Sequence, residues 1–105
     1  MTFRNLIDGA WVDGPAQPNI NPSDLDDVIG DYARADASQA RDALAAARAA
    51  FPRWSRTTIQ QRAELLDRVG SEILGRRGEI ADMLSREEGK TLVEAMGEVV
   101  RAGNT

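Results

Sequence analysis

Four carboxylates near the end of the sequence have a spacing that could support acid–base chemistry: Glu87, Glu88, Glu94 and Glu98. Glu94 and Glu98 lie one helical turn apart, so a helix would place both on one face. Paired carboxylates can act as general acid and general base. Neighbours such as Glu87 and Glu88 instead point apart on a helix. Like charges one turn apart are more typical of a solvated strip, and we interpret the four residues in that way.

The sequence "GKT" at residues 89–91 resembles the end of a phosphate-binding loop. The full motif needs a glycine five residues before Gly89, in a loop that follows a strand. Position 84 is leucine, and a helical pattern precedes the stretch. We therefore predict Gly89 to be the left-handed residue that ends a helix. A dinucleotide-binding glycine pattern is not expected either, because the glycines follow a helical segment and not a strand: Gly70, Gly75 and Gly78.

The chain of 105 residues contains no cysteine and no histidine. This composition excludes disulfides, thiolate nucleophiles, a Ser-His-Asp triad and the common zinc sites. The net charge of −4 is uneven, because residues 1–36 carry two arginines against seven aspartates. The basic residues do not gather on one face, so nucleic-acid binding is not expected. The sequence shows no secretory signal or membrane span, and we predict a soluble, cytoplasmic chain.

Short apolar runs separated by turn residues predict strands in residues 1–36. Asp8-Gly9, between "LI" and "WV", predicts a β-hairpin, and "VIGDY" at residues 28–32 predicts a third strand. The proline-rich residues 15–24 are predicted to be a loop. We expect no partner for these strands within the chain, which indicates a sheet completed elsewhere. Trp11 and Trp54 are interpreted as packing or interface residues.

The pattern becomes helical after Asp36, which with Gln39 resembles a capping box. Pro52 is expected to end the first helix at about Phe51, and Thr57 with Gln60 to begin a second. The first two helices each carry an apolar line, made of Ala40, Leu44, Ala47 and Phe51 in the first and of Ile59, Ala63, Leu66, Val69 and Ile73 in the second. A third helix is predicted over residues 79–88.

A capping box of Thr91 and Glu94 predicts a fourth helix. Its apolar residues lie on two sides, with Leu92, Met96 and Val99 on one and Val93 and Val100 on the other. A helix that is apolar on two sides needs neighbours on both. We therefore divide the chain into strands and loops (residues 1–36) and a helical segment (residues 37–105), and we expect it to be the beginning of a larger enzyme.

Five stretches occur in an order that resembles the N-terminal part of the aldehyde dehydrogenase superfamily: "LIDGAWVDG", "INPSD", "AAARAAFPRWS", "QQRAELLDRVGSEIL" and "SREEGKTLVEAMGEV". The similarity extends from about Asn5 to the end and is greatest to the α-ketoglutaric semialdehyde (2,5-dioxovalerate) dehydrogenases. It implies an α/β fold of which this chain is the N-terminal part, with short hairpin strands followed by about four helices. Residues 37–105 would pack on a downstream cofactor-binding domain.

The resemblance implies an NAD- or NADP-dependent enzyme that oxidises an aldehyde to a carboxylate. In the family a cysteine attacks the aldehyde, hydride passes to the cofactor, and a glutamate activates the hydrolytic water. These residues and the cofactor ligands all lie downstream of position 105. No catalytic or cofactor-binding residue is therefore assigned to this chain, which is expected to be inactive alone and to need the rest of an oligomeric dehydrogenase.

The resemblance also implies a monovalent cation site, because some family members bind such an ion with a carbonyl before the "NP" turn and a later acidic side chain. The corresponding residues here are Ile20 and Glu98. Oxygen ligands suit a hard cation. The alternative for Glu98 is an ordinary surface carboxylate. For the whole chain, the alternative is a naturally short, non-catalytic interaction module that binds a dehydrogenase subunit or itself.

Overall fold

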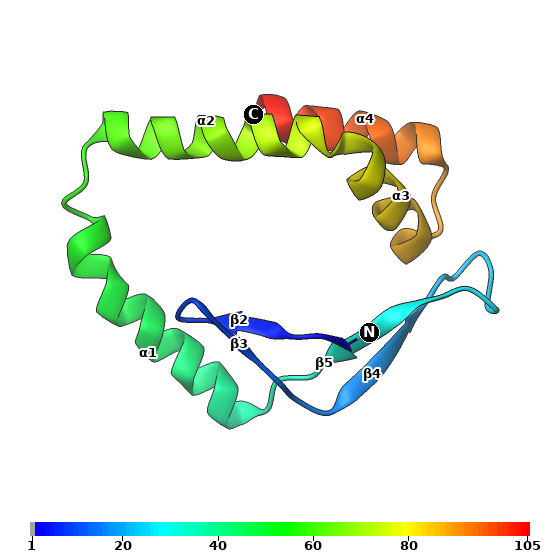
Figure 1. Ribbon diagram of the computed structural model, residues 1–105, viewed down its shortest axis with the longest axis horizontal. Coiled ribbons are helices and arrows are strands. Elements are labelled where there is room, and N and C mark those ends of the chain that lie inside the picture. Colours follow the sequence, from blue (N-terminus) through cyan, green and yellow to red (C-terminus); the bar gives the residue numbers. More distant parts are fainter. Residues whose placement is uncertain (1) are drawn as a thin grey trace. The chain divides into compact units, whose positions relative to one another are not determined.

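The computed structural model describes residues 2–105 as five short strands followed by four helices (Figure 1). The strands are β1 (Thr2–Phe3), β2 (Asn5–Ile7), β3 (Ala10–Val12), β4 (Ala16–Ile20) and β5 (Val28–Ala33). The helices are α1 (Ala37–Trp54), α2 (Ile59–Gly75), α3 (Arg77–Glu88) and α4 (Leu92–Asn104). This content is the α/β arrangement predicted. None of the helices in the described part is long and apolar enough to cross a bilayer.

Two compact units make up the chain. The first contains residues 2–19 and 30–57, and the second contains residues 20–29 and 58–105. Each unit therefore combines strand or loop residues with helices. The division at residue 36 coincides with the change from strands to helices, but as a domain boundary it stays a prediction.

In the first unit, β2 and β3 form the predicted antiparallel hairpin, with Leu6 opposite Trp11. Asp8 and Gly9 turn the chain with φ angles of 51° and 76°. Two successive left-handed residues match the twist of a hairpin and explain the Asp-Gly pair. The hairpin lies beside α1. The Asn5 side chain donates to the side-chain oxygen of Gln39 at 3.1 Å, and the Gln39 side chain donates to the backbone carbonyl of Asp13 at 2.7 Å.

A second sheet has the strand order β1-β5-β4, with β1 and β5 parallel. The expectation that the strands lack partners in the chain was therefore wrong. The proline-rich loop was also predicted wrongly, because residues 16–20 form β4. Pro18 is tolerated there since β4 lies at the edge of the sheet, where a missing N–H group need not break a ladder. The rings of Phe3 and Tyr32 stack across β1 and β5 with centroids 4.7 Å apart.

Helix boundaries follow the predicted caps with small corrections. Asp36 accepts from the Gln39 N–H at 2.8 Å, as expected. Helix α1 continues through Pro52 to Trp54, because a proline in the last turn removes one hydrogen bond while the Ser55 N–H still reaches the Phe51 carbonyl at 2.8 Å.

The start of α2 was predicted one residue too early. Its capping box is Thr58 with Gln61, while the Thr57 hydroxyl donates to the Trp54 carbonyl at 2.7 Å. Thr91 and Glu94 form the predicted capping box of α4. Gly89 ends α3 with φ of 71°, as predicted.

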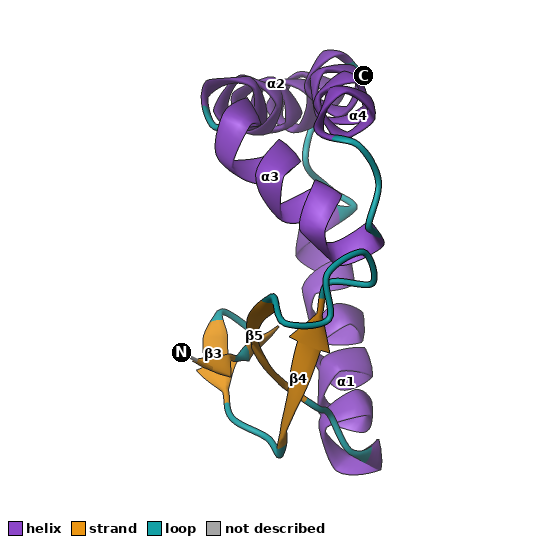
Figure 2. Ribbon diagram, turned by 90° about the vertical axis from the view of Figure 1, so that its right-hand side faces the viewer, coloured by secondary structure: helices purple, strands orange, loops and turns teal. Residues whose placement is uncertain are grey.

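The core of the second unit is small. Its buried hydrophobic residues are Ala81 of α3 and Ala95 and Val99 of α4. Ile73, Ile80, Leu84 and Met96 pack around them and are half-buried. Helix α4 lies alongside α2 in both views (Figure 1, Figure 2). Most large apolar side chains of α2 stay exposed, including Ile59 at 80% and Leu66 at 68%.

Candidate functional site

An ion pair between distant parts of the sequence fastens the loop of residues 21–27 to α3. The Arg86 guanidinium donates to both oxygens of the Asp27 carboxylate, at 2.8 and 2.5 Å. Asn21 also donates to Asp27 at 3.1 Å. These hydrogen bonds, first that from Arg86 and then that from Asn21, lower the pKa of Asp27 from 3.8 to about 2. A bidentate, partly shielded pair of this kind is the stronger form of arginine–carboxylate contact.

A second contact ties the same loop to the end of α3. The Ser23 hydroxyl donates to the Gly89 carbonyl at 2.8 Å. The Asn21 side chain accepts from the Ser23 N–H at 2.9 Å and thereby holds the turn that presents Ser23. The "INPSD" stretch thus helps to hold the connection between α3 and α4 in place.

Lys90, between α3 and α4, is the centre of a small charged cluster. Its ammonium contacts the Glu88 carboxylate at 2.7 Å and also pairs with Glu98 of α4. Hydrogen bonds to Glu88 and then Glu98 raise the pKa of Lys90. Lys90 therefore stays protonated at neutral pH and is unsuitable as a nucleophile or general base. The Lys90 carbonyl in turn accepts from the Ser85 hydroxyl at 2.7 Å.

The two residues of the predicted cation site both belong to the second unit. Ile20 ends β4 directly before the Asn21-Pro22 turn, as the prediction requires. Glu98 lies in α4, and its carboxylate already has the Lys90 ammonium as counter-ion. Within residues 2–105 no three potential metal-binding side chains cluster together. The cation site stays a prediction, in which a cation would have to share Glu98 with Lys90.

Glu94, another of the acidic candidates, has a structural role. Glu94 accepts from the Thr91 hydroxyl at 2.9 Å as part of the α4 capping box. Trp11 and Trp54 are 60% and 48% exposed, so their predicted interface role would need a surface that covers them.

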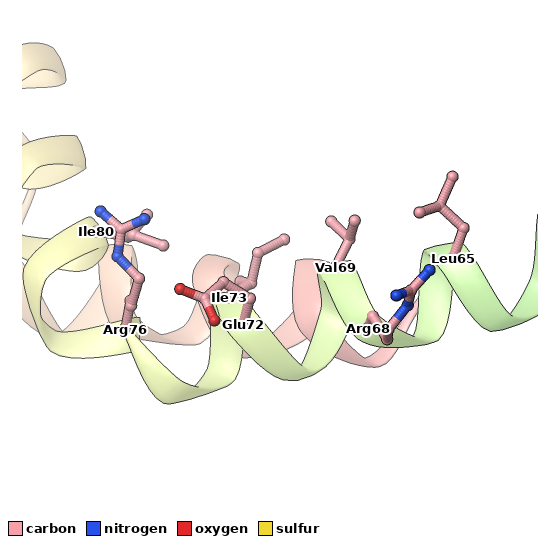
Figure 3. Close-up of a pocket in the computed structure, with 7 residues that line it drawn as sticks. All are labelled: Leu65, Arg68, Val69, Glu72, Ile73, Arg76 and Ile80. Carbon is pink, nitrogen blue, oxygen red and sulfur yellow. The ribbon is translucent and has the colours of Figure 1, made fainter.

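A shallow groove of about 330 Å³ runs along one flank of α2 (Figure 3). Its apolar side chains are Leu65, Val69 and Ile73 of α2 and Ile80 of α3, and its charged ones are Arg68, Glu72 and Arg76. Leu65, Val69 and Ile73 project from α2 toward the same side in Figure 3. The groove offers apolar surface edged by charge and no nucleophile. It suits packing against another segment of protein better than chemistry on a small molecule.

Sequence reasoning missed the Asp27–Arg86 pair and the Lys90 cluster. The first joins residues 59 positions apart, and no local spacing rule indicates such a contact. The second could have been suspected in part, because Lys90 follows Glu88 by two positions. Together these contacts hold loops and helix ends in place.

Comparison with known proteins identifies the family to which this chain is similar. The model of the aldehyde dehydrogenase family matches residues 11–105. An N-succinylglutamate 5-semialdehyde dehydrogenase of Chromobacterium violaceum is 41% identical over 96 residues, which cover 90% of this chain and 20% of that protein. An alpha-ketoglutaric semialdehyde dehydrogenase of Bacillus subtilis is 34% identical over 103 residues, covering 95% and 21%. Other members are thus as close as those acting on α-ketoglutaric semialdehyde.

The fold agrees with solved structures of the same family. The crystal structure of an NAD-dependent aldehyde dehydrogenase from Sinorhizobium meliloti superposes with a TM-score of 0.93 at 32% identity, covering 99% of this chain and 22% of that one. The chain spans about a fifth of the length of the relatives it matches. The match falls on the N-terminal part of these enzymes. The chain belongs to the aldehyde dehydrogenase family.

Proposed function

We propose that this chain is the N-terminal segment of an NAD- or NADP-dependent aldehyde dehydrogenase that oxidises an aldehyde to a carboxylate. The observation that carries the proposal is the match to the N-succinylglutamate 5-semialdehyde dehydrogenase. It is 41% identical over 96 residues, and these residues make up only 20% of that protein. The parent enzyme would be a cytoplasmic oligomer. The segment alone would be inactive, because its sequence has no cysteine to attack an aldehyde.

The proposed substrate is an aldehyde that also carries a carboxylate, with α-ketoglutaric semialdehyde as the specific candidate. The relatives named for N-succinylglutamate 5-semialdehyde and alpha-ketoglutaric semialdehyde support this class. Their names share the semialdehyde group and differ in the rest of the molecule. The residues that would select among such aldehydes are not assigned in this chain.

The test begins with the intact mass of the gene product in its own cells. A product several times heavier than 11.4 kDa is expected. That product should reduce NAD+ or NADP+ in the presence of a semialdehyde, measured as absorbance of the reduced cofactor, while the purified 105-residue chain should give no signal. Cofactor reduction by the short chain, or none by the long product with any semialdehyde, would contradict the proposal.

The alternative is a naturally short interaction module that binds a dehydrogenase subunit or itself. Exposed apolar side chains on α1 and α2, such as Phe51 and Leu66, favour it to the extent that they need a cover. A cellular product of 11.4 kDa that copurifies with a dehydrogenase, or that self-associates, would support the module. A monomeric short product without such a partner would exclude it.

For the parent enzyme we also propose that the Ile20 carbonyl and the Glu98 carboxylate help to bind a monovalent cation. The position of Ile20 before the Asn21-Pro22 turn and the partly exposed Glu98 carboxylate support this. Thermal stability should then rise when sodium or potassium replaces tetramethylammonium at equal ionic strength. Glu98→Gln should abolish the difference, whereas Glu79→Gln, on the surface of α3, should keep it. A wild-type enzyme indifferent to the cation would exclude the site.

A further inference from the structure

Aspartate followed by glycine occurs twice in the sequence, at Asp8-Gly9 and at Asp13-Gly14. Glycine leaves its own backbone nitrogen unhindered, since it has no side chain. That nitrogen can attack the side-chain carboxyl carbon of the preceding aspartate and close a succinimide ring. The two pairs have the same local sequence, but the structure holds them differently.

The Asp8-Gly9 pair, at the tip of the β2–β3 hairpin, is exposed and little constrained. Asp8 has φ of 51°, in the left-handed region where a non-glycine residue is strained. Within residues 2–105 its carboxylate has no hydrogen bond or ion pair. The loop closes between Ile7 and Ala10, so the Gly9 N–H group lies outside the ladder of the hairpin. A Cβ atom on Gly9 would meet nothing within 4 Å, so the nitrogen beside it is accessible.

The Asp13-Gly14 pair is held at the peptide group that would have to rotate before a ring could close. The Gln39 side chain donates to the backbone carbonyl of Asp13 at 2.7 Å, and this carbonyl belongs to the same peptide group as the Gly14 nitrogen. Gly14 is also half-buried, and a Cβ atom there would lie 2.6 Å from the Arg34 carbonyl oxygen. Exposure of the carboxylate does not decide the difference, because the Asp13 side chain is 81% exposed.

From these observations we propose that Asp8 is a site of spontaneous isomerisation to isoaspartate, whereas the fold protects Asp13. A bond forms between the Gly9 nitrogen and the Asp8 carboxyl carbon, and the N–H proton leaves with the carboxyl hydroxyl as water. Water then adds to the ring at the former backbone carbonyl, and the bond from that carbon to the nitrogen breaks. The chain now runs through the side-chain carbon atoms of Asp8. One water is lost and one is gained, so the reaction needs no oxidant or reductant.

Isoaspartate at position 8 would loosen the first unit. It adds a carbon atom to the backbone of a loop whose two left-handed residues match the twist of the flanking strands. The pairing of Leu6 with Trp11 would then lose its register. The hydrogen bond from Asn5 of the hairpin to Gln39 of α1 depends on that register. The modified fraction of the protein is therefore expected to hold its hairpin less firmly on α1.

The test follows the purified gene product, as its cells make it, during weeks of incubation at physiological temperature and pH. Trypsin then releases residues 5–34 as one peptide, because cleavage follows Arg4 and Arg34. Electron-transfer fragmentation of this peptide distinguishes isoaspartate from aspartate at each position. Isoaspartate is expected to rise with time at Asp8 and to stay at its starting level at Asp13. The isolated peptide, incubated in the same way, is the matched control and should isomerise at both positions.

A substitution tests the attacking group. Gly9→Ala places a methyl group beside the nitrogen and should slow the reaction at Asp8 severalfold, in the protein and in the isolated peptide alike; a rate equal to that of wild type would exclude attack by this nitrogen. If Asp8 stays unchanged in the protein while the peptide isomerises, the fold protects Asp8 and the inference is wrong. Equal rates at Asp8 and Asp13 in the protein would overturn the structural reason for the difference.

Discussion

Gly89→Ala should destabilise the second unit strongly. Gly89 has φ of 71°, and a non-glycine residue pays ~1–2 kcal/mol in that region. A Cβ atom there would also lie 2.5 Å from the Ser23 hydroxyl oxygen and 2.8 Å from Pro22. Relief of such overlap costs a further ~1–3 kcal/mol. Together the two effects lower the free energy of unfolding by roughly 2–5 kcal/mol.

The matched control is Gly78→Ala, near the start of α3, the helix that Gly89 ends. A Cβ atom on Gly78 meets nothing within 4 Å, so alanine should stabilise the helix by ~0.5–1 kcal/mol. Urea unfolding of the purified chain, followed by circular dichroism, measures both midpoints. Gly89→Asn separates the two causes, because asparagine tolerates the left-handed region but keeps the overlap with Ser23. Equal midpoints for Gly89→Ala and Gly78→Ala would refute the reasoning.

Three further predictions concern the second unit. Because the pKa of Asp27 is about 2 against an ordinary 3.8, its ionised form stabilises the fold above pH 3.8, and this contribution is lost as pH falls through about 2. Asp27→Asn should therefore lower the urea midpoint at neutral pH and lose that deficit toward pH 2; a deficit unchanged with pH would contradict this. Gly70→Ala should lower the free energy of unfolding by ~1–3 kcal/mol, because it would push α2 and α4 apart. Gly97→Ala should instead stabilise the protein, since a Cβ atom there meets nothing within 4 Å. Urea titration of both variants measures the difference. Thr91→Ala should cost ~1 kcal/mol by removing the α4 cap; a melting temperature equal to wild type would argue against the capping box.

The sequence predicted those elements whose signals are local. The hairpin turn at Asp8-Gly9, the N-cap at Asp36 and the capping box of Thr91 with Glu94 each depend on residues within a few positions. The end of α1 was missed because Pro52 lies in a last turn, where the loss of one N–H is tolerated. β4 was missed because a proline-rich stretch can still be an edge strand once β5 is beside it.

The site was less predictable for a physical reason. The Asp27–Arg86 pair depends on how the loop of residues 21–27 lies against α3. One aspartate among the seven before residue 37 gives no sign of its partner. The family resemblance predicted the aldehyde dehydrogenase family correctly because it used order and spacing over nearly the whole chain. The resemblance could not assign a catalytic residue to this chain, since neither a cysteine nor a histidine occurs in these residues.

The exposed apolar residues connect stability with function. Full burial of one leucine, isoleucine or phenylalanine side chain contributes ~1.5–3 kcal/mol. Four such side chains are still 66–80% exposed, so covering the rest of them would add roughly 4–9 kcal/mol: Leu44, Phe51, Ile59 and Leu66. That amount is comparable to the whole stability of an ordinary domain. A cover within the same polypeptide would make stability independent of protein concentration, whereas a self-associating module would gain stability as concentration rises. Either cover would bury the four side chains. The relationship to proteins about five times as long favours a cover from the same polypeptide.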